Sequence, residues 1–237
     1  MAYIKTQLGK LCYKPKILYL GIKQIDREVA FNNLYDVYHI LKRHNLKVCP
    51  FIGTLLGIIR ENNFIEWDED IDLYILKEDE ESLKNVLWDF VDNGFDVVRY
   101  ERRGLYTIMR NNEYIDFYIL HNITPTLRWS GGLDFVFEKY LSDTIEWNFK
   151  GIQVYVPREY EEFLTLRYGN WRTPVKYADF EIKGIKKLLI KSSFIIKNSL
   201  PDFLYYKMLH FYHKKDLKKF INECMKRGIK IQKDIIF

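Results

Sequence analysis

Apolar residues recur at helical spacing in three parts of the chain. The spacing predicts an amphipathic helix over residues 22–45. A second helix is expected from Leu83 to Val91, with acidic residues in its first turn and Gly94 beyond its end. A third helix is predicted from Pro157 to Tyr168, because proline favours a first helical position and Gly169 follows.

Short apolar stretches predict the first strand and the turn after it. Leu46 to Ile52 contains Pro50, which suits an edge strand. The strand is expected to run into a tight turn at Gly53 and Thr54, and residues 55–60 are typical of one or two helical turns.

Strict alternation predicts a strand over residues 70–75. The period of two places Asp70 and Asp72 on one face of the strand and Ile71, Leu73 and Ile75 on the other. A further strand is expected at residues 114–120, where Asp116 shares a face with two tyrosines.

Residues 95–100 and 105–110 complete the predicted sheet as a hairpin. Together these elements indicate an α+β fold, with a mixed β-sheet flanked by helices in a body of residues 1–174. Residues 175–237 are expected to form a C-terminal extension of two or three basic helices that start near Ile182.

Composition fits a folded enzyme-sized chain. The 237 residues are 48% hydrophobic and 29% charged, which excludes a disordered or fibrous protein. The three cysteines are widely spaced and predict neither a disulfide framework nor a zinc site. The longest uncharged stretch, residues 48–59, is too short to span a bilayer, and lysines interrupt every apolar run near the N-terminus. We therefore expect a cytoplasmic protein, either free or peripheral at the inner face of the membrane.

Charge is distributed unevenly along the chain. Residues 175–237 hold 15 basic and 6 acidic residues, so residues 1–174 hold the remaining 22 and 26, and the net charges are +9 and −4. The total of +5 is too small to indicate a nucleic-acid partner. The basic segment from Ile182 to Ile196 fits an anionic membrane surface, and fits equally well an ordinary solvated helix packed on the body.

Carboxylates are concentrated just before and within the alternating strand, at Glu66, Asp68, Glu69, Asp70 and Asp72. Two carboxylates on alternate strand positions, with Cβ atoms roughly 7 Å apart, can converge on one hard cation such as Mg²⁺. An isolated pair of this kind is more often a solvated loop. The context favours a metal site, because backbone amides at the glycine turn can cradle a phosphate and a third strand aspartate lies between apolar neighbours.

Several motifs, taken in order, resemble a known family. The glycine turn, the D-I-D at residues 70–72 and the separate Asp116 are similar to elements of the nucleotidyltransferase superfamily. More narrowly, G-T-L-L-G-x-x-R, F-I-x-W-D-x-D-I-D, Y-I-D-F and V-P-x-x-Y-x-x-F-L-x-x-R-Y-G-x-W-x-T-P resemble the LicD family, to which fukutin-type proteins are related. The resemblance extends over residues 22–174.

The resemblance implies a reaction. It implies transfer of a phosphoalcohol, such as phosphocholine, from a CDP-activated donor to a sugar hydroxyl, with release of CMP. The acceptor would belong to a cell-surface polysaccharide such as lipopolysaccharide, or to a lipid-linked glycan. By the same resemblance Asp70 and Asp72 would hold Mg²⁺ or Mn²⁺, and Asp116 would complete the metal site or orient the acceptor.

The substrate-binding residues that the resemblance implies surround this site. Gly53 and Thr54 would approach the donor phosphates, and Arg60 would pair a phosphate oxygen. Asp68 and Trp67 lie in the acidic run, where Trp67 either stacks on the base or fixes the loop, and Trp171 is a possible wall of the site. Two alternatives remain: a true nucleotidyltransferase that attaches the nucleotide itself, and an inactive binding protein of the same fold.

Overall fold

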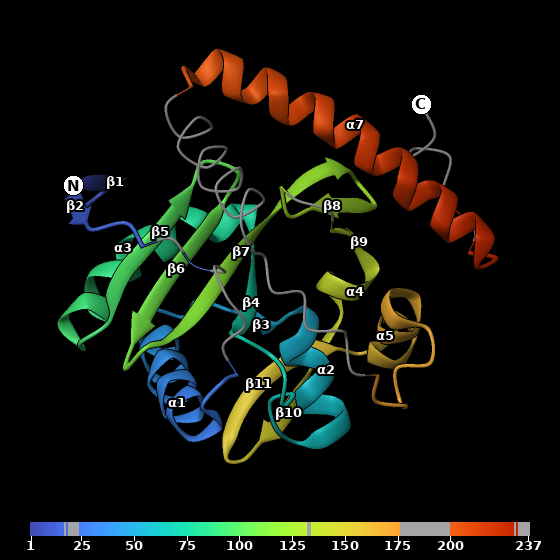
Figure 1. The fold of residues 1–237 in the computed structure, drawn as a ribbon, viewed down its shortest axis with the longest axis horizontal. Coiled ribbons are helices and arrows are strands. Elements are labelled where there is room, and N and C mark those ends of the chain that lie inside the picture. Colours follow the sequence, from blue (N-terminus) through green and yellow to red (C-terminus); the bar gives the residue numbers. More distant parts are fainter. Residues whose placement is uncertain (17, 19–23, 132–133, 176–199, 230, 232–237) are drawn as a thin grey trace, which may run out of the picture.

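A mixed β-sheet forms the centre of the molecule in the computed structural model (Figure 1). The structure describes residues 1–16, 18, 24–131, 134–175, 200–229 and 231. The main path of the sheet runs in the order β3 (Cys49–Pro50), β4 (Ile71–Leu76), β7 (Glu113–Thr124), β6 (Leu105–Arg110) and β5 (Asp96–Glu101). Two short strands, β8 (Leu127–Trp129) and β9 (Phe135–Phe137), extend it from the far end of β7.

Both parallel and antiparallel pairs occur in this sheet. β4 and β7 are parallel, whereas β3 and β4, β6 and β7, and β5 and β6 are antiparallel. The predicted hairpin and both predicted central strands are therefore confirmed, to within a few residues at their ends. So is the α+β fold class with its mixed sheet flanked by helices.

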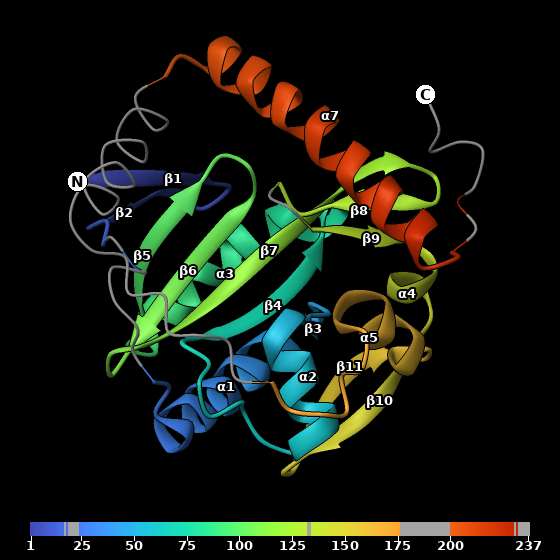
Figure 2. The ribbon, with the colours of Figure 1, turned by 45° about the vertical axis from the view of Figure 1, so that its right-hand side comes forward.

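Two helices cover one face of the sheet, α1 (Arg27–Arg43) and α3 (Glu80–Asp92). They contact each other, α1 contacts β7 and α3 contacts β5, and Figure 2 shows α3 behind the sheet. The predicted helix of residues 22–45 was too long at its start. The helix begins only after Asp26, because the Asp26 carboxylate accepts hydrogen bonds from the amides of Glu28 and Val29 and so caps the first turn.

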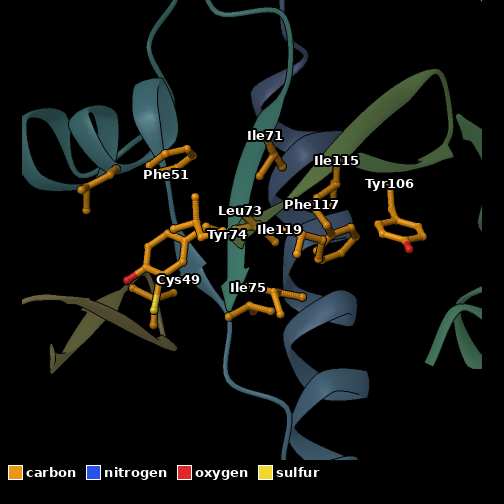
Figure 3. Close-up of a cluster of buried hydrophobic side chains, with 14 of the residues drawn as sticks. Cys49, Phe51, Ile71, Leu73, Tyr74, Ile75, Tyr106, Ile115, Phe117 and Ile119 are labelled. Atoms are coloured by element: carbon orange, nitrogen blue, oxygen red, sulfur yellow. The ribbon is translucent and has the colours of Figure 1, made fainter. Parts of the chain in front are cut away.

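The hydrophobic core lies between these helices and the sheet. Its central side chains gather around β4 in Figure 3 and come from alternate positions of the two parallel strands: Ile71, Leu73, Ile75, Ile115, Phe117 and Ile119. Aromatic rings pack within it, and Phe90 of α3 stacks on Phe117 of β7. The alternation seen in the sequence thus sends one face of each strand into the core and leaves the polar positions on the other face.

The chain enters α2 (Ile52–Glu61) directly from β3, and this corrects the predicted turn. Gly53 and Thr54 lie in the first turn of the helix rather than in a loop before it. Ile52 has a φ of 47°, a left-handed conformation that β-branched residues rarely adopt. The change of direction between β3 and α2 therefore takes place at a strained residue, not at the glycine.

Elements that the sequence did not predict lie around this centre. They are two hairpins, β1–β2 (Ala2–Thr6, Gly9–Tyr13) and β10–β11 (Thr144–Phe149, Ile152–Pro157), the short helix α4 (Lys139–Ser142) and a 3₁₀ turn (Lys77–Asp79). Helix α5 spans Tyr160–Tyr168. The prediction that Pro157 opens this helix was wrong, because Pro157 is the last residue of β11 and pairs with Thr144.

A single long helix, α7 (Asp202–Lys226), makes up most of the described part of the extension, for which two or three helices starting near Ile182 were predicted. Its sequence has no glycine or proline between Asp202 and Lys226 that would interrupt the hydrogen-bonded turns. Leu217 and Cys224 are buried against the body. The basic segment of residues 182–196 lies outside the described residues. Among the helices that are described, none is long and apolar enough to cross a membrane.

Candidate functional site

Three aspartates from two neighbouring strands come together on the polar face of the sheet. Asp70 directly precedes β4, Asp72 is its second residue, and Asp116 lies at the register position opposite Asp72 on the parallel strand β7. One oxygen from each carboxylate lies within 4.8 Å of the oxygens of the other two. All three side chains are buried, and Asp116 has no exposed surface.

A row of polar side chains runs across four strands through this cluster. Asp72 on β4 pairs in register with Asp116 on β7, Asp116 with Thr107 on β6, and Thr107 with Arg99 on β5. Residues opposite each other on neighbouring strands point to the same face of a sheet. The antiparallel hairpin therefore delivers a hydroxyl and a guanidinium to the carboxylate of Asp116.

The carboxylate of Asp116 is held by both of these groups. Thr107 Oγ1 donates a hydrogen bond to Asp116 Oδ1 at 2.5 Å, and Arg99 Nη2 forms an ion pair with Asp116 Oδ2. Arg99 Nε also donates to Thr107 Oγ1 at 2.9 Å, so that the three side chains form one chain of hydrogen bonds. Such partners fix the orientation of a carboxylate that serves as a metal ligand.

The backbone of Asp72 is held on the other side by the β3–α2 connection. The amide of Asp72 donates to Thr54 Oγ1 at 2.8 Å, and its carbonyl oxygen accepts from the amide of Phe51 at 2.9 Å. Burial raises the pKa of the Asp72 carboxyl well above its usual value. The charges of Asp70, Asp116, Asp68 and Asp134 raise this pKa further. Asp72 is thus fixed in place among other negative charges.

Asp68 lies against the start of α2. Burial raises the pKa of its carboxyl to about 6; a backbone hydrogen bond lowers the pKa, and the charge of Glu69 raises it. A Cβ on Gly53 would collide with this carboxylate. Gly57, one turn further along the helix, meets the backbone of the following loop, where a Cβ would lie 2.5 Å from the carbonyl oxygen of Asn63. Both glycines allow the acidic loop to approach the helix.

The three-aspartate cluster has the chemistry of a site for a hard divalent cation. Mg²⁺ prefers carboxylate oxygens, commonly takes only one or two carboxylates, and completes its shell with water and substrate phosphates. The raised pKa of Asp72 reflects burial and, after it, repulsion by neighbouring carboxylates, and a cation would relieve this repulsion. Converging buried oxygens that repel one another fit Mg²⁺ or Mn²⁺.

The predicted substrate-binding residues are distributed along α2 and its neighbours. Gly53 and Thr54 place their backbone amides at the N-terminus of α2, a position that favours anions. The Thr54 side chain, however, is buried and bonded to the backbone of Asp72. Arg60 lies about 10 Å further along the helix from the rise per residue, where it contacts Glu61 and donates to the carbonyl oxygen of Trp171 at 3.1 Å.

The two predicted tryptophans occupy different environments. Trp67 is 43% exposed on the loop before β4, whereas Trp171 is 6% exposed and belongs to the hydrophobic core. Trp171 Nε1 donates to Thr165 Oγ1 of α5 at 3.2 Å. The structure brings Arg60 and Trp171 together, and the roles of all these residues toward a substrate stay predictions.

Four residues near the carboxylates were not singled out from the sequence. Arg99 and Thr107 are separated from Asp116 in the chain and reach it only through strand pairing. Asp134 forms an ion pair with Arg167 of α5, Nη2 to Oδ1, at 2.5 Å. For Arg167 a signal existed, since it is the arginine of the R-Y-G-x-W motif noted above.

A groove of about 520 Å³ lies elsewhere, between the C-terminal half of α1 and the β10–β11 hairpin. It is lined by residues such as Tyr38, His39, Lys47 and Tyr155. Its lining includes none of the predicted site residues, so the groove is distinct from the carboxylate cluster.

Comparison with known proteins identifies relatives of this chain. Residues 48–159 match the model of the family described as LicD/FKTN/FKRP, nucleotidyltransferase domain. An uncharacterized protein from Rickettsia typhi is 27% identical over 175 residues, 70% of this chain and 54% of that protein. The lipopolysaccharide cholinephosphotransferase LicD of Haemophilus influenzae is 34% identical over 55 residues, 23% of this chain and 21% of that enzyme.

Among solved structures, a nucleotidyltransferase candidate from Thermotoga maritima is 14% identical to this chain, with a TM-score of 0.39. The match covers 62% of this chain and 88% of that one. The chain spans about half the length of the first Rickettsia relative it matches. The matched residues 48–159 include all three clustered aspartates.

Proposed function

Because residues 48–159 make this chain a member of the LicD family, we propose that it is a metal-dependent phosphoalcohol transferase. It moves a phosphocholine-type group from a CDP-activated donor to a sugar hydroxyl of a cell-surface polysaccharide or lipid-linked glycan. The observation that carries the proposal is the convergence of Asp70, Asp72 and Asp116 to within 4.8 Å. The short match to the Haemophilus influenzae enzyme supports the choice of a cholinephosphotransferase reaction.

The proposed reaction is a displacement at one phosphorus. The acceptor hydroxyl oxygen forms a bond to the phosphorus that carries the alcohol, and the bond from that phosphorus to the oxygen bridging it to CMP breaks. CMP leaves with the electron pair, and the acceptor proton passes to Asp116. A weakly basic carboxylate suffices, because the transition state of phosphoryl transfer is loose and the proton leaves late.

The metal site consists of Asp70 and Asp72, with Asp116 as the third ligand or as the group that orients the acceptor. A bound Mg²⁺ or Mn²⁺ would neutralise charge on the donor phosphates and on the leaving group. Arg99 and Thr107 hold the Asp116 carboxylate in a fixed orientation for either role. The amides of Gly53 and Thr54 approach the donor phosphates from the N-terminus of α2.

The test is release of CMP in the presence of Mg²⁺ from four donors: CDP-choline, CDP-ethanolamine, CDP-glycerol and CDP-ribitol. Asp70→Asn and Asp72→Asn abolish the release, whereas Asp143→Asn, which affects an exposed ion pair with Arg158, leaves it unchanged. Turnover that survives both substitutions in folded protein contradicts the metal assignment.

Product analysis distinguishes the alternatives. A true nucleotidyltransferase releases pyrophosphate and transfers a label on the base to the acceptor, whereas the proposed transferase leaves that label in solution as CMP. An inactive binding protein of the same fold produces neither. Failure to bind either Mg²⁺ or a CDP compound in calorimetry favours the inactive protein.

We propose that the acceptor is presented at an anionic membrane surface and that α7 binds this surface. One face of α7 carries exposed aromatic and basic side chains at helical spacing: Phe203, Lys207, Phe211, Lys214 and Lys218. The helix has six lysines and three acidic residues. Rings that enter the interface and lysines that attract anionic headgroups are typical of peripheral helices.

Vesicle sedimentation tests this surface. The protein is expected to bind vesicles containing phosphatidylserine at low salt, and to bind them less at high salt because the charges are screened. Exchange of Lys207, Lys214 and Lys218 for glutamate removes the binding, whereas Lys84→Glu on α3 does not. Absence of binding to these vesicles at low salt refutes the membrane proposal and leaves the transferase proposal intact.

A further inference from the structure

An arginine and a tyrosine of α5 flank the carboxylate cluster. Arg167 and Tyr168 lie beyond the residues that match the family model. Figure 2 shows α5 beside α2. The Arg167 guanidinium carbon lies 5.8 Å from the centre of the Phe51 ring, and the amide of Phe51 donates to the carbonyl oxygen of Asp72. Phe51 thus lies between Arg167 and the backbone of Asp72 in this chain of contacts.

Electrostatic effects indicate the same proximity. The charge of Asp134, the partner of Arg167, contributes to the raised pKa of Asp72. The pKa of Tyr168 is raised to about 12, mainly by burial; the charges of Asp72 and Asp68 also raise it, and Arg167 lowers it. These charges interact because the end of α5 and the acidic cluster share one poorly solvated region.

Two polar groups here have no hydrogen bond of normal geometry in the described part of the chain. Arg167 Nε and the Tyr168 hydroxyl are both buried without a partner of good hydrogen-bond geometry, although the two side chains lie close enough for the Arg167 side chain to lower the pKa of Tyr168 through a weaker hydrogen bond. Arg167 makes its ion pair through Nη2 alone, Nη2 to Asp134 Oδ1 at 2.5 Å. The Nε and Nη2 atoms form the edge of a guanidinium that binds a phosphate through two parallel hydrogen bonds. Asp134 therefore occupies one half of a phosphate-binding edge.

We infer that Arg167 and Tyr168 form an anion subsite for the diphosphate of the donor, and that Asp134 holds Arg167 until the donor binds. The inference rests on the proposed function, because the donor supplies the diphosphate. Arg167 exchanges one anionic oxygen partner for another, so its own charge stays neutralised. Asp134 is left beside Asp72, where the cation that accompanies a diphosphate offsets its charge. Arg167 is a binding residue in this scheme, and Asp134 is a positioning residue.

The experiment measures binding by calorimetry for Mg²⁺ alone, for CDP-choline with Mg²⁺, and for inorganic pyrophosphate with Mg²⁺. The variants are Arg167→Gln, Arg167→Lys and Asp134→Asn. The exposed ion pair of Arg158 and Asp143 supplies matched controls, Arg158→Gln and Asp143→Asn. Melting temperatures show whether each variant is folded, and Arg167→Lys retains a cation opposite Asp134 in case Arg167→Gln does not fold.

Substitutions of Arg167 and of Asp134 are expected to have different effects on donor binding. Arg167→Gln weakens binding of the donor and of pyrophosphate about tenfold to hundredfold, while binding of Mg²⁺ alone changes little. Arg167→Lys recovers part of this loss. Asp134→Asn leaves donor binding unchanged or strengthens it a few fold, because Arg167 no longer has to leave a charged partner. The two control variants bind like the unaltered protein.

A purely structural ion pair gives a different pattern. If Asp134→Asn weakens donor binding as much as Arg167→Gln does, or if Arg167→Gln binds both ligands normally, the inference is wrong. Binding of pyrophosphate distinguishes a failure of the proposed anion subsite from a failure of the proposed transferase function. Unaltered protein that binds pyrophosphate through Arg167 but no CDP-alcohol supports the subsite and contradicts the transferase. Unaltered protein that binds neither ligand overturns both.

Discussion

The two ends of the polar row differ in how their charges are compensated. Toward β6 and β5, the carboxylate of Asp116 meets the Thr107 hydroxyl and the Arg99 guanidinium, all buried. Toward α2, the carboxylate of Asp72 meets the charges of Asp70, Asp68 and other carboxylates. The two residues occupy the same register on adjacent parallel strands.

The difference separates a carboxylate whose charge the protein compensates by itself from a carboxylate whose repulsion by its neighbours a cation would relieve. A buried carboxylate with a guanidinium and a hydroxyl is satisfied, and removal of either partner leaves an uncompensated group. A buried carboxylate among others is destabilised by repulsion, which a cation relieves. Substitutions on the two sides should therefore change stability in opposite directions.

The largest effect on stability is expected for Asp116→Asn. It removes the charge of the nearest anionic partner of the buried Arg99 guanidinium, whose ion pair with Glu101 is longer at 4.0 Å, and this should cost about 3–5 kcal/mol of the free energy of unfolding. Urea denaturation measures this change. Asp143→Asn, in the exposed ion pair with Arg158, should cost less than about 1 kcal/mol. Equal losses in the two variants would show that the buried ion pair of Arg99 and Asp116 contributes no more to stability than an exposed ion pair.

Asp72→Asn should have the opposite sign in metal-free protein. Because the folded-state pKa of Asp72 is raised, its ionised form destabilises the fold, and the neutral amide should stabilise it by about 1 kcal/mol or more. The gain should be absent near pH 4 and below, where the carboxyl is protonated, and should grow as the pH rises toward 7.

The same variant should lose function. The proposed transfer should fall by about a hundredfold or more. Mg²⁺ is expected to raise the melting temperature of the unaltered protein and should not raise that of the variant. Thermal melts with and without Mg²⁺ across this pH range test both statements. A loss of stability in Asp72→Asn without metal would contradict the comparison of the two ends.

Thr54→Val tests the backbone support of Asp72 on the α2 side. The buried amide of Asp72 loses its acceptor, Thr54 Oγ1, at a cost of about 1–3 kcal/mol. Thr144→Val, whose hydroxyl accepts only from an exposed lysine in the described contacts, should change stability by less than about 0.5 kcal/mol. Denaturation of both variants gives the difference, and an equal cost would show that the Thr54 hydroxyl is not needed.

The smallest effect on stability is expected for Gly53→Ala. The new Cβ meets only the carboxylate end of Asp68, which can rotate away, so the cost should stay below about 1 kcal/mol. The rotation should move the pKa of Asp68 from about 6 toward its usual value, which carbon-13 NMR can follow. Gly57→Ala meets backbone atoms that cannot rotate away, and should cost about 1–3 kcal/mol without this pKa change.

Local patterns predicted the elements that build the centre of the site. Strict alternation identified β4, and Asp116 between apolar neighbours marked β7 as a strand with a polar position. The same local reasoning failed where a tertiary contact decides the backbone. The chain turns at Ile52 with a φ of 47°, and Gly53 lies against the carboxylate of Asp68. Neither feature has a local signal.

The hairpins and the long helix show the same limit. β10 and β11 pair through a turn at Lys150 and Gly151, and this pairing draws Pro157 into a strand although the sequence favours it as a helix start. For the C-terminal extension the sequence predicted two or three helices, yet no glycine or proline interrupts residues 202–226, and they form one helix. Long-range pairing and uninterrupted helix continuity outweighed these local preferences.

The sequence by itself indicated that Asp72 and Asp116 occupy polar positions on strands, with Asp70 two residues before Asp72, because side-chain direction in a strand follows from its period of two. Only the tertiary structure decided that Asp72 and Asp116 share one register, and that Arg99 and Thr107 compensate one of them. It also decided that Arg167 of α5 pairs with Asp134, whose charge acts on Asp72. The physical reason is that charge compensation in a buried region depends on distances across strands and between elements, and sequence spacing does not encode these distances.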